Sequence, residues 1–303
     1  MKYVHQHNDF NLFINQIADK LQIDKFVIEK DYWVTYILKN ISKSEFKDEM
    51  IFKGGTCLSK AYNLIDRFSE DIDLLVIEND KTISKRQKEL RLKKFRNFLD
   101  TISDIKYVSG SRSDLYANFR YGFDTKSETG VISKEVLLEP GYRGGIKPKI
   151  ETKEITSFVE KELDGKLNEY DTKPFEIKIL SLERIFIEKL FAVKELFEKN
   201  TIVSKTRHYY DIYKLLQTKE IKDLLKNTDE IKNVVEDIND VNKKYFKIEP
   251  ILWKALINHK SIKPDKDLFE NLNKGYINDK QLYFKEQPDF KIIISYIMEM
   301  LNI

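Results

Sequence analysis

Residues 52–60, with the sequence FKGGTCLSK, and residues 67–76, RFSEDIDLLV, decide the fold expected for this chain. The apolar start of the first segment predicts a short strand that ends at Gly54 and Gly55, where the missing side chains allow a tight turn and the close approach of a ligand. Residues 58–65 have apolar side chains at helical spacing, and the apolar end of the second segment is typical of a buried strand. The sequence therefore predicts a strand, a glycine turn, a helix and a second strand.

Two carboxylates open the second strand. Asp71 and Asp73 are two residues apart, so both side chains project from one face of an extended chain. Neighbouring carboxylates repel each other without a cation, and Mg²⁺ prefers one or two carboxylates together with waters and the phosphate oxygens of a substrate. Thr56 lies at the expected start of the helix, where its hydroxyl and the free amides of the first turn form an anion site. The combination predicts a phosphate cradle facing a carboxylate pair for a metal.

Each feature by itself has an ordinary structural explanation. An Asp-x-Asp pair is common on solvated strand edges, and a Gly-Gly pair is common in turns. Their succession within one short segment favours the metal and phosphate site. The pattern is not the Walker loop, because no Gly-x-x-x-x-Gly-Lys followed by Ser or Thr occurs in the chain.

The composition of the 303 residues, with 41% hydrophobic and 34% charged side chains, predicts a soluble globular protein with a highly charged surface. The chain has neither a signal-peptide pattern nor an apolar run of about 18 residues, so we expect a cytoplasmic location. The single cysteine, Cys57, excludes an internal disulfide and is expected to be a small packed residue.

A strongly basic stretch follows the carboxylate strand. Residues 81–96 contain a single acidic residue, Glu89. Their basic residues are Lys81, Lys85, Arg86, Lys88, Arg91, Lys93, Lys94 and Arg96. A helix with this composition suits the backbone of a nucleic acid. A solvated helix face is an equally good interpretation. Leu90, Leu92, Phe95, Phe98 and Leu99 are its expected buried side.

The C-terminal half is predicted to be helical. Ser181 is a good N-cap, with Glu183 in the first turn of a helix that runs to about Phe197. Lys189 falls between its buried neighbours, where an amine needs an anionic partner. Arg207 and Asp211 are four residues apart on the next expected helix and can pair with each other. His208 is expected to be exposed.

Residues 54–60 and 67–74 together resemble the first motif of the AbiEii-type nucleotidyltransferases. These are toxins of type IV toxin–antitoxin systems and belong to the DNA polymerase β-like nucleotidyltransferase superfamily. Residues 29–34, EKDYWV, resemble the N-terminal helix of the family, where Lys30 is expected to form a surface ion pair. Residues 181–190 and 207–213 resemble its later motifs, so the resemblance covers roughly residues 24–216.

The resemblance implies an α+β fold with two lobes. Residues 1–172 would form the nucleotidyltransferase lobe, with a mixed sheet and flanking helices, and residues 173–303 a mainly helical lobe. It implies Mg²⁺ and an NTP substrate. A third carboxylate on a later strand would activate the attacking hydroxyl, and Glu139 fits that place better than Glu135; its alternative role is an exposed strand end. The implied catalytic residues are Asp71, Asp73, Lys189, Asp211 and Glu139, with Asp71 and Asp73 as metal ligands, and the implied nucleotide-binding residues are Gly54, Gly55, Thr56, Lys60, Ser69 and Arg207.

The function implied by the resemblance is a toxin with a role in phage defence. It would transfer NMP from an NTP to an RNA and so block translation and growth. The preferred acceptor is the 3′ end of tRNA. A cognate antitoxin encoded nearby is the implied protein partner. Two alternatives remain open at this point: a GTP-type nucleotide-binding toxin without RNA transfer, and a nucleotidyltransferase that acts on a small molecule or a protein.

Overall fold

The computed structural model describes residues 2–69, 71–77, 84–125 and 133–303. Contacts divide the chain into two compact units. Unit 1 comprises Met1–Tyr62, Phe68–Arg143 and Glu151–Ile179, and unit 2 comprises Asn63–Arg67, Gly144–Ile150 and Leu180–Ile303. Two short segments of the N-terminal half thus belong to the C-terminal unit. The predicted domains, residues 1–172 and 173–303, stay a prediction, because compact units defined by contacts do not show which parts fold independently.

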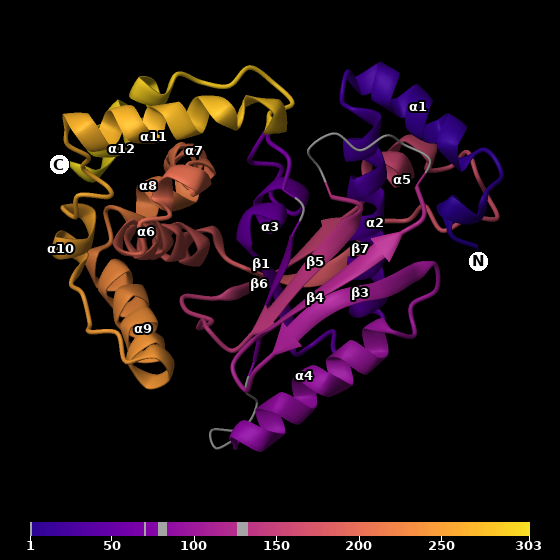
Figure 1. Cartoon of the computed structure of the whole chain (residues 1–303), viewed down its shortest axis with the longest axis horizontal. Helices are drawn as coiled ribbons and strands as arrows, with labels where there is room; N and C mark the ends of the chain where they lie inside the picture. Colours follow the sequence, from indigo (N-terminus) through magenta and orange to yellow (C-terminus); the bar gives the residue numbers. More distant parts are fainter. Residues whose placement is uncertain (1, 70, 78–83, 126–132) are drawn as a thin grey trace. The chain divides into compact units, whose positions relative to one another are not determined.

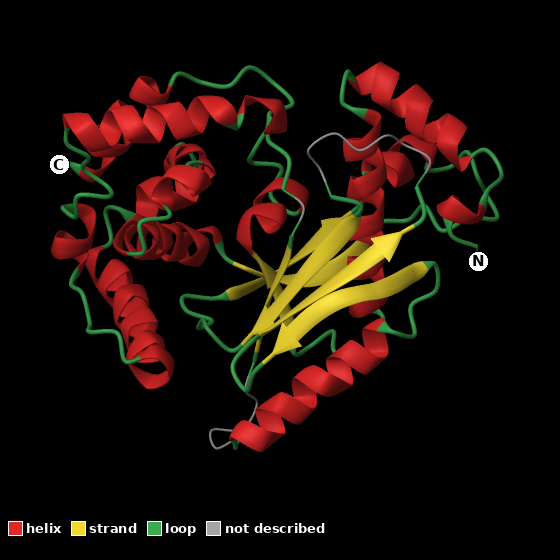
Figure 2. Ribbon diagram, viewed as in Figure 1, coloured by secondary structure: helices red, strands yellow, loops and turns green. Residues whose placement is uncertain are grey.

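Unit 1 is built on a seven-stranded mixed sheet with the order β3-β4-β5-β2-β1-β7-β6 (Figures 1 and 2). Its strands are β1 (Met50–Lys53), β2 (Ile72–Val76), β3 (Ile105–Arg112), β4 (Ala117–Phe123), β5 (Glu135–Gly141), β6 (Ile150–Ile155) and β7 (Phe175–Leu180). Its helices are α1 (Phe10–Leu21), α2 (Lys25–Ser42), α3 (Gly54–Lys60), α4 (Lys85–Leu99) and α5 (Phe158–Leu163), with a short 3-10 turn, η1 (Val4–Gln6).

The pairing of the central strands places the predicted carboxylate strand in the middle of the sheet. β2 runs antiparallel to β1 on one side and parallel to β5 on the other. β5 in turn pairs antiparallel with β4, and β1 pairs parallel with β7. A sheet with both kinds of pairing and helices around it confirms the predicted α+β fold class.

One face of the sheet carries the core of unit 1. On β4, Tyr121 donates to the backbone oxygen of Arg96 on α4, at 3.4 Å, and Phe123 stacks on Trp33 of α2, with ring centroids 5.3 Å apart. Residues two apart on a strand share a face, so α2 and α4 cover the same side. The other face is also buried at Ile51 and Leu75, and polar side chains begin on it at Lys53 and Asp73.

Unit 2 is mainly helical (Figure 2). Its helices are α6 (Leu182–Glu198), α7 (Arg207–Leu216), α8 (Lys219–Leu224), α9 (Thr228–Phe246), α10 (Trp253–Ile257), α11 (Lys266–Asn278) and α12 (Phe290–Leu301), with the 3-10 turns η2 (Ile202–Lys205) and η3 (Lys280–Leu282). The hydroxyl of Ser181 accepts from the backbone N–H of Arg184, which confirms the predicted N-cap of α6. The predicted C-terminal bundle of helices is therefore present.

Two elements were not predicted from the sequence: β3 and α5. β3 lies at the edge of the sheet, and residues 106–111 are all exposed, so its side chains show no alternation of apolar and polar residues. α5 is too short for a helical period. α11 lies in the stretch that was predicted to be helical, but its bounds were not predicted.

Two details of the predicted elements are wrong. The helix expected over residues 58–65 begins at Gly54 and ends at Lys60, because Asn63 has a left-handed φ of 49° and the chain then enters unit 2. On α4, Leu90 is 53% exposed instead of buried, while Leu92, Phe95 and Leu99 pack inward. Helical spacing alone does not say how wide the buried stripe is.

Candidate active site

A row of three charged side chains crosses the centre of the sheet in unit 1. Lys53 on β1 is directly opposite Asp73 on β2, and Asp73 is opposite Glu139 on β5. Residues paired in this way project from the same face of a sheet. The strand order therefore brings the predicted third acid beside the predicted carboxylate pair, although Asp73 and Glu139 are 66 positions apart in the chain.

This row lies on the face of the sheet opposite the apolar core. Ile72, Leu138 and Phe119 form the neighbouring row across β2, β5 and β4, and all three are buried. Because side chains alternate along a strand, Asp73 and Glu139 point away from that core. Asp73 is half-buried and Glu139 is exposed. The carboxylates are thus placed where a ligand can reach them.

The glycine turn packs directly against the row. Gly54 has a φ of 77°, and a Cβ on it would lie 1.9 Å from Oδ2 of Asp73. Any side chain would both strain the backbone and collide with the carboxylate. Gly54 therefore lets the start of α3 approach Asp73 closely, which is the arrangement that the sequence predicted for the turn.

The other predicted nucleotide-binding residues of unit 1 have partners within it. The buried Thr56 hydroxyl donates to Oγ of Ser69 at 3.0 Å, so the structure brings these two predicted residues together. Lys60 is engaged by Asp31, with Nζ 2.6 Å from Oδ1, and its side chain is 6% exposed. Lys60 therefore holds α3 against α2.

The donor set fits a magnesium ion that is completed by a substrate. Within the described parts of the chain, no three His, Cys, Asp or Glu side chains gather closely enough to hold a metal by themselves. Mg²⁺ commonly uses only one or two carboxylates and takes its remaining ligands from water and phosphate. Asp71, directly before β2, and Asp73 on it are two such carboxylates, both half-buried.

In unit 2, Asp211 lies at the centre of a buried cluster of charges. Arg67 donates to both of its carboxylate oxygens, at 2.7 and 2.6 Å, and Nζ of Lys189 lies 2.6 Å from Oδ2. Arg67 is 2%, Lys189 6% and Asp211 0% exposed. The expected need of Lys189 for an anionic partner is met by Asp211. The cluster joins segment 63–67, α6 and α7.

The expected pair of Arg207 with Asp211 does not form among the described residues. Arg67 occupies both carboxylate oxygens in a bidentate geometry that one arginine supplies completely. Arg207 lies half-buried at the first position of α7. The partner of Asp211 thus comes from a segment 144 residues away, which helical spacing cannot predict.

Opposite charges control the ionisation of the cluster. Burial by itself raises the pKa of Asp211, but the charges of Arg67 and Lys189 outweigh it and hold this pKa well below its ordinary value. The aspartate is therefore ionised. Among the described residues that contact Asp211, the two cations Arg67 and Lys189 share this one carboxylate.

The histidine beside this cluster was expected to be exposed and is not. His208 is half-buried, and its Nδ1 is buried without a hydrogen-bond partner among the described residues. Burial, followed by the charge of Lys189, holds the pKa of His208 well below its ordinary value. His208 is therefore neutral at pH 7, because a third cation would be repelled there.

Lys30 was expected on the surface and is fully buried. Its exposure is 0%, and Nζ donates to the backbone oxygen of Ser133 at 2.8 Å. α2 is buried along most of its length, and Lys30 lies on its buried side, whereas Lys25 at its start is exposed. The prediction of a surface ion pair was wrong because it treated α2 as having a solvated side.

The basic stretch forms α4, but acids of unit 1 compensate much of its charge. Arg91 pairs with Glu49 at 2.7 Å, and Arg96 lies 3.5 Å from Asp100. Lys94 pairs with Glu45, and Lys88 is buried with Nζ over the ring of Tyr142. Lys81 lies outside the described residues. These pairings favour the interpretation of α4 as a solvated, ion-paired helix.

The chain matches a known family over most of its length. The family model described as nucleotidyl transferase AbiEii toxin, type IV toxin–antitoxin system, matches residues 36–294. The chain belongs to the AbiEii family. It is accordingly a nucleotidyltransferase toxin of the type IV kind, as its motifs predicted. The match extends well beyond residue 216, where the resemblance by motif ended.

Other comparisons add little to the AbiEii assignment. An H. pylori protein described as a candidate nucleotidyltransferase has a similar crystal structure, with a TM-score of 0.43 and 18% identity. The similarity covers 92% of this chain and 98% of that one. A comparison with curated protein sequences gave no significant match. In the described part of the chain, no helix is both long and apolar enough to cross a membrane.

Two residues of these sites were not singled out from the sequence. Lys53 shares the row of Asp73, and Arg67 holds Asp211. Both stand inside the segments that carry the AbiEii motif, Lys53 directly before Gly54 and Arg67 at the start of the second segment. The sequence therefore showed that both residues belong to the motif. It did not show that Lys53 lies beside Asp73 or that Arg67 binds Asp211.

Proposed function

We propose that this AbiEii toxin is a Mg²⁺-dependent nucleotidyltransferase that moves NMP from an NTP to an RNA, with the 3′ end of tRNA as first choice. The observation that carries the proposal is the row of Asp73 and Glu139 on the open face of the sheet, with the Gly54 turn against it. Carboxylates for a metal, an acid for the acceptor and a turn for phosphates are the parts that phosphoryl transfer requires.

Each residue has a stated role in this proposal. Asp71 and Asp73 would hold Mg²⁺, which would neutralise the triphosphate and the charge that develops on the transferred phosphoryl group and on the pyrophosphate that leaves. Glu139 accepts the proton of the attacking hydroxyl, with Glu135 as the alternative acid on the same face of β5. Gly55 and Thr56 contact the β- and γ-phosphates.

The cluster of unit 2 supplies positive charge in the same proposal. Lys189 contacts the triphosphate, and Asp211 together with Arg67 keeps its amine in position. The two cations gathered at Asp211 support this role, because cations attract the phosphates of a nucleotide. Lys60, Ser69 and Arg207 are proposed to support nucleotide binding, Lys60 through the position of α3.

The experiment that tests the proposal uses purified protein, total tRNA, Mg²⁺ and each α-labelled NTP in turn. The control is the Asp71→Ala/Asp73→Ala variant. We expect label on tRNA only with the unchanged protein, and the NTP that gives it identifies the substrate. Absence of label with every NTP, while NTP still binds, would exclude RNA transfer and favour the nucleotide-binding toxin or a small-molecule or protein acceptor.

The contribution of α4 to RNA binding is tested separately. Neutralising Lys93, Lys94 and Arg96 together would reduce RNA modification only if α4 contacts the RNA backbone. The ion pairs of Lys94 and Arg96 with Glu45 and Asp100 lead us to expect little change. A growth assay with and without the neighbouring antitoxin gene tests the toxin role and its partner in cells.

A further inference from the structure

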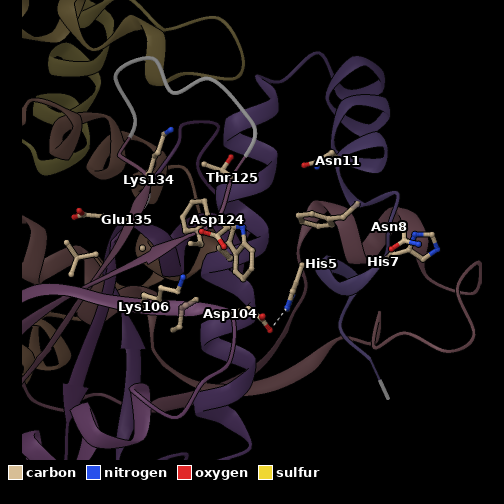
Figure 3. Close-up of a pocket in the computed structure, with 16 residues that line it drawn as sticks. His5, His7, Asn8, Asn11, Asp104, Lys106, Asp124, Thr125, Lys134 and Glu135 are labelled. Carbon is tan, nitrogen blue, oxygen red and sulfur yellow. Dashed lines mark hydrogen bonds and ion pairs between the residues drawn. The ribbon is translucent and has the colours of Figure 1, made fainter.

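A cavity of about 840 Å³ lies in unit 1 where β4 ends and where β3 and β5 begin (Figure 3). Residues of η1, α1 and α2 complete its wall. Of the residues assigned to catalysis, it contains only the alternative acid, Glu135. The site described above therefore does not account for this cavity.

The deepest part of the wall is aromatic. Phe10, Trp33 and Phe123 line the cavity, and all three are largely buried. Trp33 stacks on Phe123 with ring centroids 5.3 Å apart, and the ring of His5 lies 4.8 Å from that of Trp33. Flat rings offer a stacking surface to a flat ligand at a low cost in conformational entropy.

Polar side chains also line the cavity. The side-chain amides of Asn8 and Asn11 add donors and acceptors on the lining.

His5 is a fixed part of the wall and does not supply charge. Its Nδ1 lies 2.8 Å from the Tyr32 hydroxyl, and its Nε2 lies 3.1 Å from Oδ2 of Asp104, the contact drawn as a dashed line in Figure 3. Burial lowers the pKa of His5 against the opposing effect of Asp104. The ring is therefore neutral at pH 7 and held by two contacts.

The charged residues of the lining nearly balance. Asp104, Asp124 and Glu135 line the cavity together with Lys106 and Lys134, and Glu135 is also paired with Arg120 outside the lining, at 3.8 Å. The carboxylates can accept hydrogen bonds from the N–H groups of a neutral ring. Lys106 and Lys134 are both exposed, where they can meet phosphates outside. The chemistry fits a flat, neutral heterocycle with donors and acceptors on its edge.

We propose that the cavity binds an unpaired nucleobase of the acceptor RNA. Sequence-specific recognition of RNA commonly takes unstacked bases between aromatic side chains and reads their edges. The cavity reaches around the end of the sheet, because its lining includes Gly122 and Phe123, which are consecutive on β4 and project from opposite faces. Its Glu135 side lies on the same face of β5 as Glu139, about 13 Å away at the usual rise of a strand. A short stretch of unpaired RNA spans this distance. The inference rests on the proposed RNA acceptor.

Binding is measured without turnover, by the fluorescence of Trp33. The chain has two tryptophans, so Trp253→Phe leaves Trp33 as the only reporter. The probes are short oligoribonucleotides of adenosine, cytidine or uridine and the corresponding free nucleosides, without NTP or Mg²⁺. We expect saturable quenching by at least one oligonucleotide and much weaker quenching by its nucleoside.

Variants connect the quenching to the cavity. In the Trp253→Phe protein, Phe10→Leu keeps an apolar side chain but removes a stacking ring, and we expect binding about 5- to 150-fold weaker. Leu12→Ala on the same helix is the matched control, because Leu12 is 51% exposed and absent from the lining. By filter binding, Trp33→Phe should weaken oligonucleotide binding in the otherwise unchanged protein, and Trp253→Phe should not.

The outcomes separate this inference from the proposed function. If oligonucleotides quench Trp33 but no NTP labels tRNA, the nucleobase site is supported and the proposed NMP transfer to tRNA is rejected. The inference is overturned if no probe quenches Trp33, if Phe10→Leu and Leu12→Ala bind alike, or if nucleosides bind as tightly as oligonucleotides. That last result would identify a pocket for free nucleosides instead of RNA.

Discussion

The two groups of acids in this toxin have opposite surroundings. In unit 1, Asp73 is half-buried and Glu139 exposed on a polar face of the sheet. In unit 2, Asp211 is 0% exposed and holds Arg67 and Lys189 at hydrogen-bond distance. A buried acid whose charge is compensated by the protein stabilises the fold, whereas acids on an open face can serve a ligand. The predicted acids of this chain therefore lie in two different surroundings.

The largest expected effect is on catalysis at the open row. Asp73→Asn removes the charge needed for a metal and leaves the packing of β2 unchanged, so we expect transfer to fall by about 10²–10³-fold or more. Labelled transfer to tRNA and the melting temperature are measured together. Asp19→Asn, at an exposed position of α1, is the control. Unchanged transfer in Asp73→Asn would show that the exposed row of acids does not serve catalysis, and would contradict its proposed difference from the buried Asp211 cluster.

Asp211→Asn should act on stability first. It leaves the buried cations Arg67 and Lys189 without their anion, and breaking a buried pair in this way costs about 3–5 kcal/mol of unfolding free energy. Urea unfolding at pH 7 measures the change. Adding Arg67→Met to Asp211→Asn should recover part of the loss, because one unpaired charge is then removed. A single variant as stable as the unchanged protein would contradict the assignment.

Gly54→Ala tests whether the close contact between the glycine turn and Asp73 matters for activity. The new Cβ would lie 1.9 Å from Oδ2 of Asp73, so activity should fall about tenfold or more, in addition to the strain of a positive φ. Gly165→Ala is the matched control: Gly165 has a φ of 72° and nothing within 4 Å of an added Cβ. It should cost only about 1 kcal/mol of stability and no activity. Equal losses of activity in both variants would refute the contact with Asp73.

The smallest expected effect concerns pH and the buried cluster. His208 has a pKa held well below its ordinary value, so below a pH of about 6.5 the unfolded chain binds a proton that the folded chain refuses. Its contribution to stability is present above that pH and declines on acidification, by at most about 1.4 kcal/mol per pH unit. Urea unfolding between pH 7 and pH 5 should show a shallower decline for His208→Gln. An identical slope would mean that His208 titrates normally in the folded protein.

Local patterns predicted the regular elements well where they contain an apolar period. The helix expected from Ser181 to about Phe197 agrees with α6, and the strand expected at the apolar end of residues 67–76 agrees with β2. β3 escaped prediction because an exposed edge strand owes its shape to backbone pairing with β4. Leu90 was misassigned because the width of a buried stripe depends on what packs against the helix.

The sequence by itself determined the glycine turn, the acid pair after it, the mixed α/β content and the family. These follow from residue types at short spacing, which control local backbone geometry and side-chain direction. Only the tertiary structure decided that Glu139 lies beside Asp73 and that Arg67 holds Asp211. Strand order and ion pairs between distant segments depend on packing across the whole unit, and no short stretch of sequence contains that information.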